Sequence, residues 1–136
     1  MAIYSGIGWL FLILVLGLTG CAAPTTVVSR RQEKAAAYQA LSPEFREAAD
    51  RGALKAGMPA DAVYIAWGAP AQVLQRGSAA GEETIWIYTG GFMQETRYWG
   101  YHRLHSDYTP RTYVRAEVVF SQGVVSSWRT LPEPVD

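Results

Sequence analysis

Residues 97–111 hold the densest group of side chains in this sequence that could bind a ligand or a partner. Arginine, tyrosine and tryptophan are interleaved there, and these three types are enriched in the binding hot spots of protein interfaces. Arginine beside aromatic rings also suits an anionic headgroup at a membrane surface. We therefore predict a binding surface in this stretch, and the side chains expected to contact the partner are Arg97, Tyr98, Trp99, Tyr101, Arg103 and Arg111.

The same stretch contains the two histidines of the chain, His102 and His105, followed by Asp107. These residue types coordinate metal ions, and histidines three positions apart can share one face of a helix. Gly100 and Pro110 flank them, however, and the stretch has no helical pattern. His102, His105 and Asp107 are therefore metal candidates by residue type alone, and we predict neither a metal nor another cofactor.

The sequence offers no group of residues that would form a catalytic site. An enzyme needs a nucleophile with a positioned base, or paired carboxylates in a pocket. The adjacent acids Glu82 and Glu83 flank a predicted strand and are expected to be solvated, the histidines lie in one stretch, and no glycine-rich phosphate-binding loop is present. We therefore predict a protein that is not an enzyme.

The only cysteine, Cys21, follows Leu18-Thr19-Gly20 at the end of an apolar segment. Met1–Gly20 has no charged side chain, and Trp9–Leu18 consists almost wholly of Leu, Ile, Val and Phe. This arrangement resembles a bacterial lipoprotein signal peptide, in which Leu, a small residue, and Gly or Ala precede the cysteine. The resemblance implies cleavage before Cys21, which then becomes the first residue of the mature protein and carries lipid on its sulfur.

An uncleaved transmembrane helix is the alternative for Met1–Gly20. A spanning helix needs about 20 apolar residues, whereas a signal peptide needs about 7–15 before a small-residue cleavage site, which describes this segment better. The first five residues depart from the signal pattern because they contain no Lys or Arg. Two or more acyl chains would hold the domain on a bilayer, and by the family's sorting rule Ala22 favours the outer membrane.

Composition narrows the remaining classes of function. The chain has 12 basic and 12 acidic side chains and a formal net charge of zero, which argues against a general nucleic-acid binder. Basic and aromatic residues together also suit single-stranded nucleic acid, but an export signal removes that partner from reach. A single cysteine allows no disulfide within the chain, so the fold must rest on its apolar core.

Two helices are predicted in the first half of the folded region. Ser42-Pro43 is a typical helix start and Gly52 a typical helix end. Pro59 opens a second helix that runs to about Trp67, where Gly68 ends it. The alanine-rich stretch before Ser42 either forms another short helix or continues a tether.

After the second helix the apolar period becomes alternating, which predicts β-strands. One of these strands is expected to stop at Gly90-Gly91, and another to turn Val114, Ala116, Val118 and Phe120 inward. Helices followed by antiparallel strands predict an α+β fold with the helices on one face of a small sheet. The predicted strands are Ala71–Gln75, Glu83–Tyr88, Thr112–Phe120 and Val124–Arg129.

Three motifs follow one another in this region: Gly57-Met58, then Trp67-Gly68-Ala69-Pro70, then Trp86-Ile87-Tyr88. Together they resemble the SmpA/OmlA (BamE-like) family of small envelope lipoproteins. Over about residues 42–128, the resemblance implies an ααβββ fold and outer-membrane anchoring. It also implies a non-catalytic role beside other envelope proteins such as the β-barrel assembly machinery. Pro59 departs from the family's Ser or Thr, and the connection from Gly90 to Pro110 is longer than the family's.

Two interpretations of that long connection stay open. A connection longer than about 12–15 residues without structure of its own is usually functional or disordered. Alternatively, Met93–Trp99 and Tyr108–Arg115 lengthen the flanking strands into a longer hairpin, with Tyr and Arg side chains packing on the open face of the sheet.

The predicted organisation is a signal peptide (1–20), a tether that can be partly helical (21–41), an α+β domain (42–130) and a C-terminal tail (131–136). We predict a lipid-anchored lipoprotein on the outer membrane, facing the periplasm. It would act as a non-catalytic scaffold or accessory subunit in outer-membrane protein assembly or envelope integrity. The alternative is a periplasmic binding module that takes a lipid headgroup, a small ligand or a metal through residues 97–111.

Overall fold

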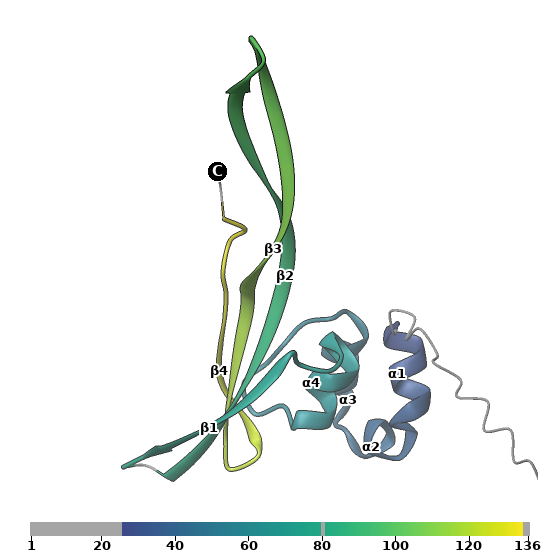
Figure 1. The fold of residues 1–136 in the computed structure, drawn as a ribbon. Coiled ribbons are helices and arrows are strands. Elements are labelled where there is room, and N and C mark those ends of the chain that lie inside the picture. Colours follow the sequence, from purple (N-terminus) through teal and green to yellow (C-terminus); the bar gives the residue numbers. More distant parts are fainter. Residues whose placement is uncertain (1–25, 80, 135–136) are drawn as a thin grey trace, which may run out of the picture.

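The computed structural model describes residues 26–79 and 81–134, where a group of helices precedes an antiparallel sheet (Figure 1). The strands are hydrogen-bonded in the order β1-β2-β3-β4. The predicted α+β class is thus confirmed, although the family resemblance implied two helices and three strands. The elements of the described residues are α1 (Val27–Glu33), α2 (Ala35–Ala40), α3 (Pro43–Asp50), α4 (Ala60–Trp67), β1 (Gln72–Ser78), β2 (Gly81–Gly100), β3 (Arg103–Ser121) and β4 (Val124–Thr130).

The two helices predicted from sequence are α3 and α4. Ser42 caps α3, because its hydroxyl oxygen accepts a hydrogen bond from the backbone N–H of Phe45 at 3.3 Å. Gly52 follows the helix with a φ of 67°, a conformation that glycine adopts at little cost. Helix α4 ends at Gly68 and begins after Pro59, which provides no side-chain cap. None of the helices in the described residues is long and apolar enough to span a membrane.

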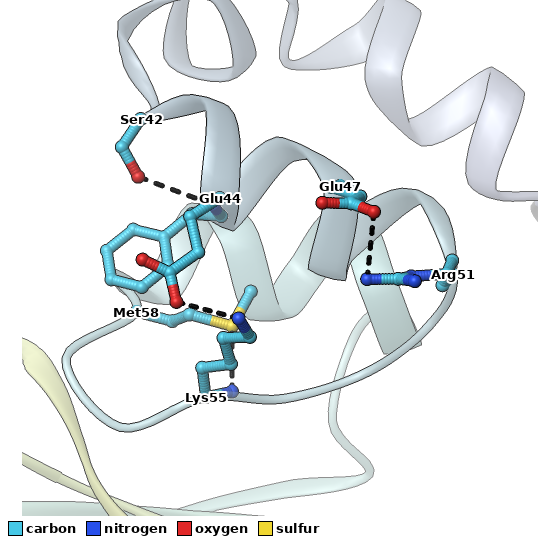
Figure 2. Close-up of polar contacts among 7 residues, drawn as sticks. Ser42, Glu44, Glu47, Arg51, Lys55 and Met58 are labelled. Carbon is cyan, nitrogen blue, oxygen red and sulfur yellow. Dashed lines mark hydrogen bonds and ion pairs between the residues drawn. The ribbon is translucent and has the colours of Figure 1, made fainter.

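Polar contacts hold the loop between α3 and α4 in place (Figure 2). The Nζ of Lys55 donates to a carboxylate oxygen of Glu44 at 2.7 Å, and the backbone N–H of Lys55 donates to the sulfur of Met58 at 3.0 Å. Glu47 and Arg51 form an i,i+4 ion pair at 3.1 Å on the exposed side of α3. Met58 itself is fully buried, so the loop is fastened to the core as well as to the helix.

Helices α1 and α2 lie in the range predicted as a tether that can be partly helical, and both pack against α4. The buried link between α1 and α4 is Arg30. Its Nε donates to the carbonyl oxygen of Ile65 at 2.9 Å, and its Nη2 donates to that of Ala66 at 3.0 Å. Carbonyls in the last turn of a helix have no partner within the helix, and a cation there also complements the helix dipole. Arg30 therefore joins α1 to the folded body.

The core lies between α4 and one face of the lower part of the sheet (Figure 1). From the sheet, Tyr88 places its hydroxyl 3.0 Å from the carbonyl oxygen of Gly68 and donates to it. Burial raises the pKa of Tyr88 well above its usual range. The buried residues of α4 and the sheet in this core are Ala62, Val63, Ile65, Ala66, Tyr88, Ala116, Val118, Phe120 and Val125.

The inward face predicted for β3 is correct at Ala116, Val118 and Phe120 and wrong at Val114, which is 37% exposed. The cause is an irregularity in the pairing of β2 with β3. Tyr88 lies opposite Ala116, but Thr89 lies opposite Val114, so Arg115 is an extra residue in β3. An extra residue shifts the alternation, and Val114 therefore shares a face with Thr89 instead of with Tyr88.

Candidate functional site

Beyond this irregularity, β2 and β3 continue together as a long two-stranded ribbon, which we call the arm (residues 89–114). It extends well past the helices (Figure 1). The pairing runs without interruption from Thr89 opposite Val114 to Gly100 opposite Arg103. Of the two interpretations of the long connection, the lengthened hairpin is therefore confirmed. The expected end of the strand at Gly90-Gly91 is wrong.

Gly90 does not break the strand because an aromatic ring lies over it. A Cβ built on Gly90 would lie 2.6 Å from the ring of Tyr113, so the ring occupies the space that a side chain would fill. Tyr113 also packs edge-on against Phe92, with ring centroids 6.1 Å apart. An aromatic residue across from a glycine stabilises such a site in a sheet. This contact joins residues far apart in sequence, and no local signal around Gly90 reveals it.

The tip of the arm is a two-residue turn made by Tyr101 and His102. Both have positive φ, 49° and 62°, as a type I′ hairpin turn requires and as Asn-Gly would provide. The turn between β3 and β4 uses Gln122 and Gly123, also at positive φ, but places a glycine at the second position. Non-glycine residues in this region are held at a cost of the order of 1 kcal/mol or more. Tyr101 is nevertheless 95% exposed at the tip.

One face of the arm carries a continuation of the face formed by Trp86 and Tyr88. Near the tip, the rings of Tyr98 and His105 stack with centroids 5.4 Å apart. The Nε2 of His105 lies 2.9 Å from the carbonyl oxygen of Gly100. Further down, the Nε of Arg111 donates to the side-chain oxygen of Gln94 at 3.0 Å. On this face Arg111 and Gln94 therefore pair across the ribbon, and His105 contacts the backbone near the turn.

The opposite face carries a row of exposed apolar side chains with one ion pair in the middle. Trp99 is 76% exposed and Met93 55%. Between them Glu95 accepts a hydrogen bond from Arg97 at 2.8 Å. Hydrogen bonds from Arg97 and Ser106 lower the pKa of Glu95 to about 2, so the pair is ionised at neutral pH. The other exposed apolar residues on this face are Leu104, Tyr108, Pro110 and Val114.

The structure distributes the six predicted contact residues over the whole arm. Arg97 and Trp99 share one face, whereas Tyr98, Arg103 and Arg111 belong to the other, and Tyr101 occupies the turn. They therefore form two half-sites and a tip, and one flat patch cannot include them all. Met93 and Leu104 were not predicted as contact residues. Met93 shares a face with Arg97, and Leu104 lies opposite Trp99, but both facts become visible only once the pairing of the strands is known.

The three residues considered for metal binding are not assembled into a site. His102 lies in the turn, and the imidazole of His105 is stacked on Tyr98 and faces the Gly100 carbonyl. Asp107 lies opposite Thr96, further down the ribbon. Across the part of the chain that the structure describes, no three His, Cys, Asp or Glu side chains are grouped closely enough to hold a metal ion.

Comparison with known proteins gives no relative for this chain: no family model, curated protein or solved structure matches it. The SmpA/OmlA assignment and the lipoprotein assignment therefore remain predictions from sequence motifs. Cys21, the predicted lipid attachment site, lies outside the described residues.

Proposed function

We propose that this protein is a lipid-anchored envelope lipoprotein that acts as a non-catalytic scaffold or accessory subunit, with the arm as its docking element. The observation that carries the proposal is the arm itself. It is a long ribbon with exposed aromatic and apolar side chains at its far end, among them Trp99 and Tyr101. Exposed aromatic and arginine residues are typical of binding hot spots.

The anchor is supported by the Leu18-Thr19-Gly20-Cys21 motif. If lipid is attached at Cys21, the chain to the start of α1 at Val27 spans at most about 20 Å when extended. Arg30 fastens α1 to α4, so the helical body would then stay close to the membrane. The paired residues of the arm, at about 3.3 Å each, reach about 40 Å beyond that body. This arrangement suits contact with a second envelope component, and we place the protein on the periplasmic face of the outer membrane.

The strained turn supports a role for the tip. A protein gains nothing in stability from Tyr101 and His102 at positive φ, where Asn-Gly would cost less. Strained backbone conformations cluster at functional sites, because the surrounding structure maintains them for a purpose. We therefore assign Tyr101 and the neighbouring Trp99 to contact with the partner, which we propose is an envelope protein of the outer-membrane assembly machinery.

Two full-chain experiments test the two halves of the proposal. Changing Cys21→Ser should abolish lipid incorporation, measured by mass spectrometry, and should release the protein from membranes. A photo-cross-linking residue at Tyr101 should capture an outer-membrane assembly protein in intact cells, whereas the same residue at Val73, an exposed position on β1, should not.

Each half can fail separately. A Cys21→Ser chain that is still processed and retained on membranes contradicts the lipid anchor. Cross-linking at Tyr101 to lipid alone, or to nothing, would contradict the docking role and favour the binding-module alternative.

A further inference from the structure

Within the arm, the outer edge of β2 is unpaired. Strand β1 pairs with β2 only from Gly81 to Ile87, so in the described residues the stretch 89–100 pairs on one side only, with β3. An isolated two-stranded ribbon is only marginally stable in water. An unpaired edge also offers a row of N–H and C=O groups to another strand. The arm therefore has both a physical reason and the backbone groups to add a strand.

The β2 edge of the arm is more suitable for adding a strand than the β3 edge. Strand β3 contains Pro110, which has no N–H to donate. Proline is tolerated in strands where its nitrogen faces solvent, so it interrupts the row of donors on an outer edge. Residues 89–100 of β2 contain neither proline nor lysine, the residues that commonly protect an edge from pairing.

The side chains along this edge are complementary to themselves. When two copies of a strand pair antiparallel about a two-fold axis normal to the sheet, facing residues lie on the same face and at equal distances from the axis. An axis at Thr96 places Glu95 opposite Arg97 of the partner subunit. It also places Met93, 55% exposed, opposite the partner's Trp99, so two exposed apolar side chains cover each other.

Neighbouring registers lose this match. An axis at Glu95 would place two carboxylates opposite each other, and an axis at Arg97 would do the same with two guanidinium groups. Like charges directly opposite one another destabilise a strand pair, whereas opposite charges and apolar pairs stabilise it. Among these registers, only the one centred on Thr96 places opposite charges opposite each other and also pairs the exposed apolar side chains.

We propose that the arm pairs with the arm of a second copy of this chain through the β2 edge, antiparallel and with Thr96 at the two-fold axis. The two ribbons then become one four-stranded sheet. The occupant is a second copy because charge and apolar complementarity of the edge with itself select one register. This inference stands on the arm alone and is independent of lipid attachment.

Disulfide cross-linking of the full chain in detergent solution tests the register. In a Cys21→Ala background, Thr96→Cys places its thiol opposite its own counterpart. Opposed Cα atoms in antiparallel strands are about 4.5–5.5 Å apart, a separation that a disulfide spans. Thr109→Cys is the matched control, an exposed threonine on the same face of the arm but on β3. Thr96→Cys should form covalent dimers at least about tenfold faster, and equal rates would overturn the proposal.

Charge exchange then distinguishes specific pairing of the two β2 edges from non-specific association. In the Thr96→Cys background, two copies of the Glu95→Arg chain should repel each other, because Arg97 of each copy then faces an arginine. Two copies of the Arg97→Glu chain should repel each other in the same way, because Glu95 of each copy then faces a glutamate. A mixture of the Glu95→Arg chain and the Arg97→Glu chain should cross-link again, because each charge then meets its opposite. Recovery in the mixture also shows that both variants fold. Single variants that still dimerise, or a mixture that stays monomeric, would overturn the Thr96-centred pairing.

Discussion

The same two strands, β2 and β3, build two very different regions of this molecule. In the base (81–88 of β2 and 116–121 of β3), helix α4 covers one face, and Phe120 is buried against Trp86 with ring centroids 4.9 Å apart. In the arm no helix covers either face (Figure 1). The corresponding aromatic pair there, Phe92 with Tyr113, is only partly buried. Both regions consist of paired strands, but only the base is covered by a helix.

This difference indicates that the two regions are stabilised by different means. Burial of apolar surface, at about 25 cal/mol per Å², dominates in the base. The arm depends on its ladder of backbone hydrogen bonds and on cross-strand side-chain pairs, each of which contributes about 0.2–1 kcal/mol. We therefore expect the arm to open locally at a free energy well below that of global unfolding. Such a region can order on binding a partner without any change in the base.

The largest effect that separates the two regions is expected from their aromatic pairs. Phe120→Ala removes a buried ring from the core and should lower the free energy of unfolding by about 3–5 kcal/mol. Phe92→Ala removes a half-exposed ring from the arm and should cost about 1 kcal/mol or less. Urea denaturation of both variants measures the difference. Similar losses for the two would show that the arm unfolds as one unit with the base.

The second effect concerns the attachment of α1 to α4, the helix that covers the base. Arg30→Ala would leave the carbonyl oxygens of Ile65 and Ala66 without their donor from α1. Hydrogen bonds to a charged group contribute about 1.5–3 kcal/mol, and we expect a loss of about 2–3 kcal/mol in the free energy of unfolding. Arg30→Lys should recover only part of it, because an ammonium group lacks the planar fork of donors. Hydrogen exchange in α1 should accelerate in both variants, and full stability in Arg30→Ala would contradict this role.

The helices and the base could be predicted from sequence far better than the arm, and the reason is the range of the contacts. Ser42-Pro43 and Gly52 act on their immediate neighbours, so the bounds of α3 followed directly from their types. The attachment of α1 is the exception. Arg30 donates to the carbonyl groups of Ile65 and Ala66, and nothing near Arg30 in the sequence indicates these hydrogen bonds.

In the arm nearly every determinant is of this non-local kind. Gly90 stays within a strand because of Tyr113, and Val114 faces outward because β3 has an extra residue at Arg115. The tip lacks the Asn-Gly signal of a two-residue turn, since Tyr101 and His102 occupy it. The composition of residues 97–111 drew attention to the tip. Their division between two faces could not be predicted before the register of the hairpin was known.

The third effect tests whether the Tyr113 ring that lies over Gly90 stabilises the arm. Gly90→Ala introduces a Cβ that meets the ring of Tyr113 at 2.6 Å, so the ring must move and its contact with Phe92 is weakened. We expect a cost of about 1 kcal/mol, confined to the arm. Gly91→Ala is the matched control, because its Cβ would approach the Arg111 carbonyl oxygen only to 3.7 Å, an ordinary contact. Backbone NMR should show altered Tyr113 shifts in Gly90→Ala alone, and equal perturbation by both variants would refute the ring's role.

The smallest effect is the pH dependence of the ion pair in the arm. The pKa of Glu95 is about 2 in the folded protein because Arg97 and Ser106 donate hydrogen bonds to the carboxylate, against an ordinary value of 4.5. A lowered pKa means that the ionised form favours the ordered arm. This contribution is complete above about pH 4.5 and is lost as the pH falls from there toward 2. In the base, Arg129 likewise lowers the pKa of Glu117, which provides an internal reference.

A carboxyl NMR titration of both glutamates therefore compares the two regions directly. Arg97→Gln should raise the Glu95 midpoint toward 4.5 and leave Glu117 unchanged, because the hydrogen bond from Arg97 is the largest cause of the shift at Glu95. Arg129→Gln should do the reverse, since Arg129 is the main cause at Glu117. If Glu95 titrates near 4.5 in the unmodified protein, the pair is not formed in solution. The order of the arm would then depend on backbone pairing and on its other cross-strand side-chain pairs.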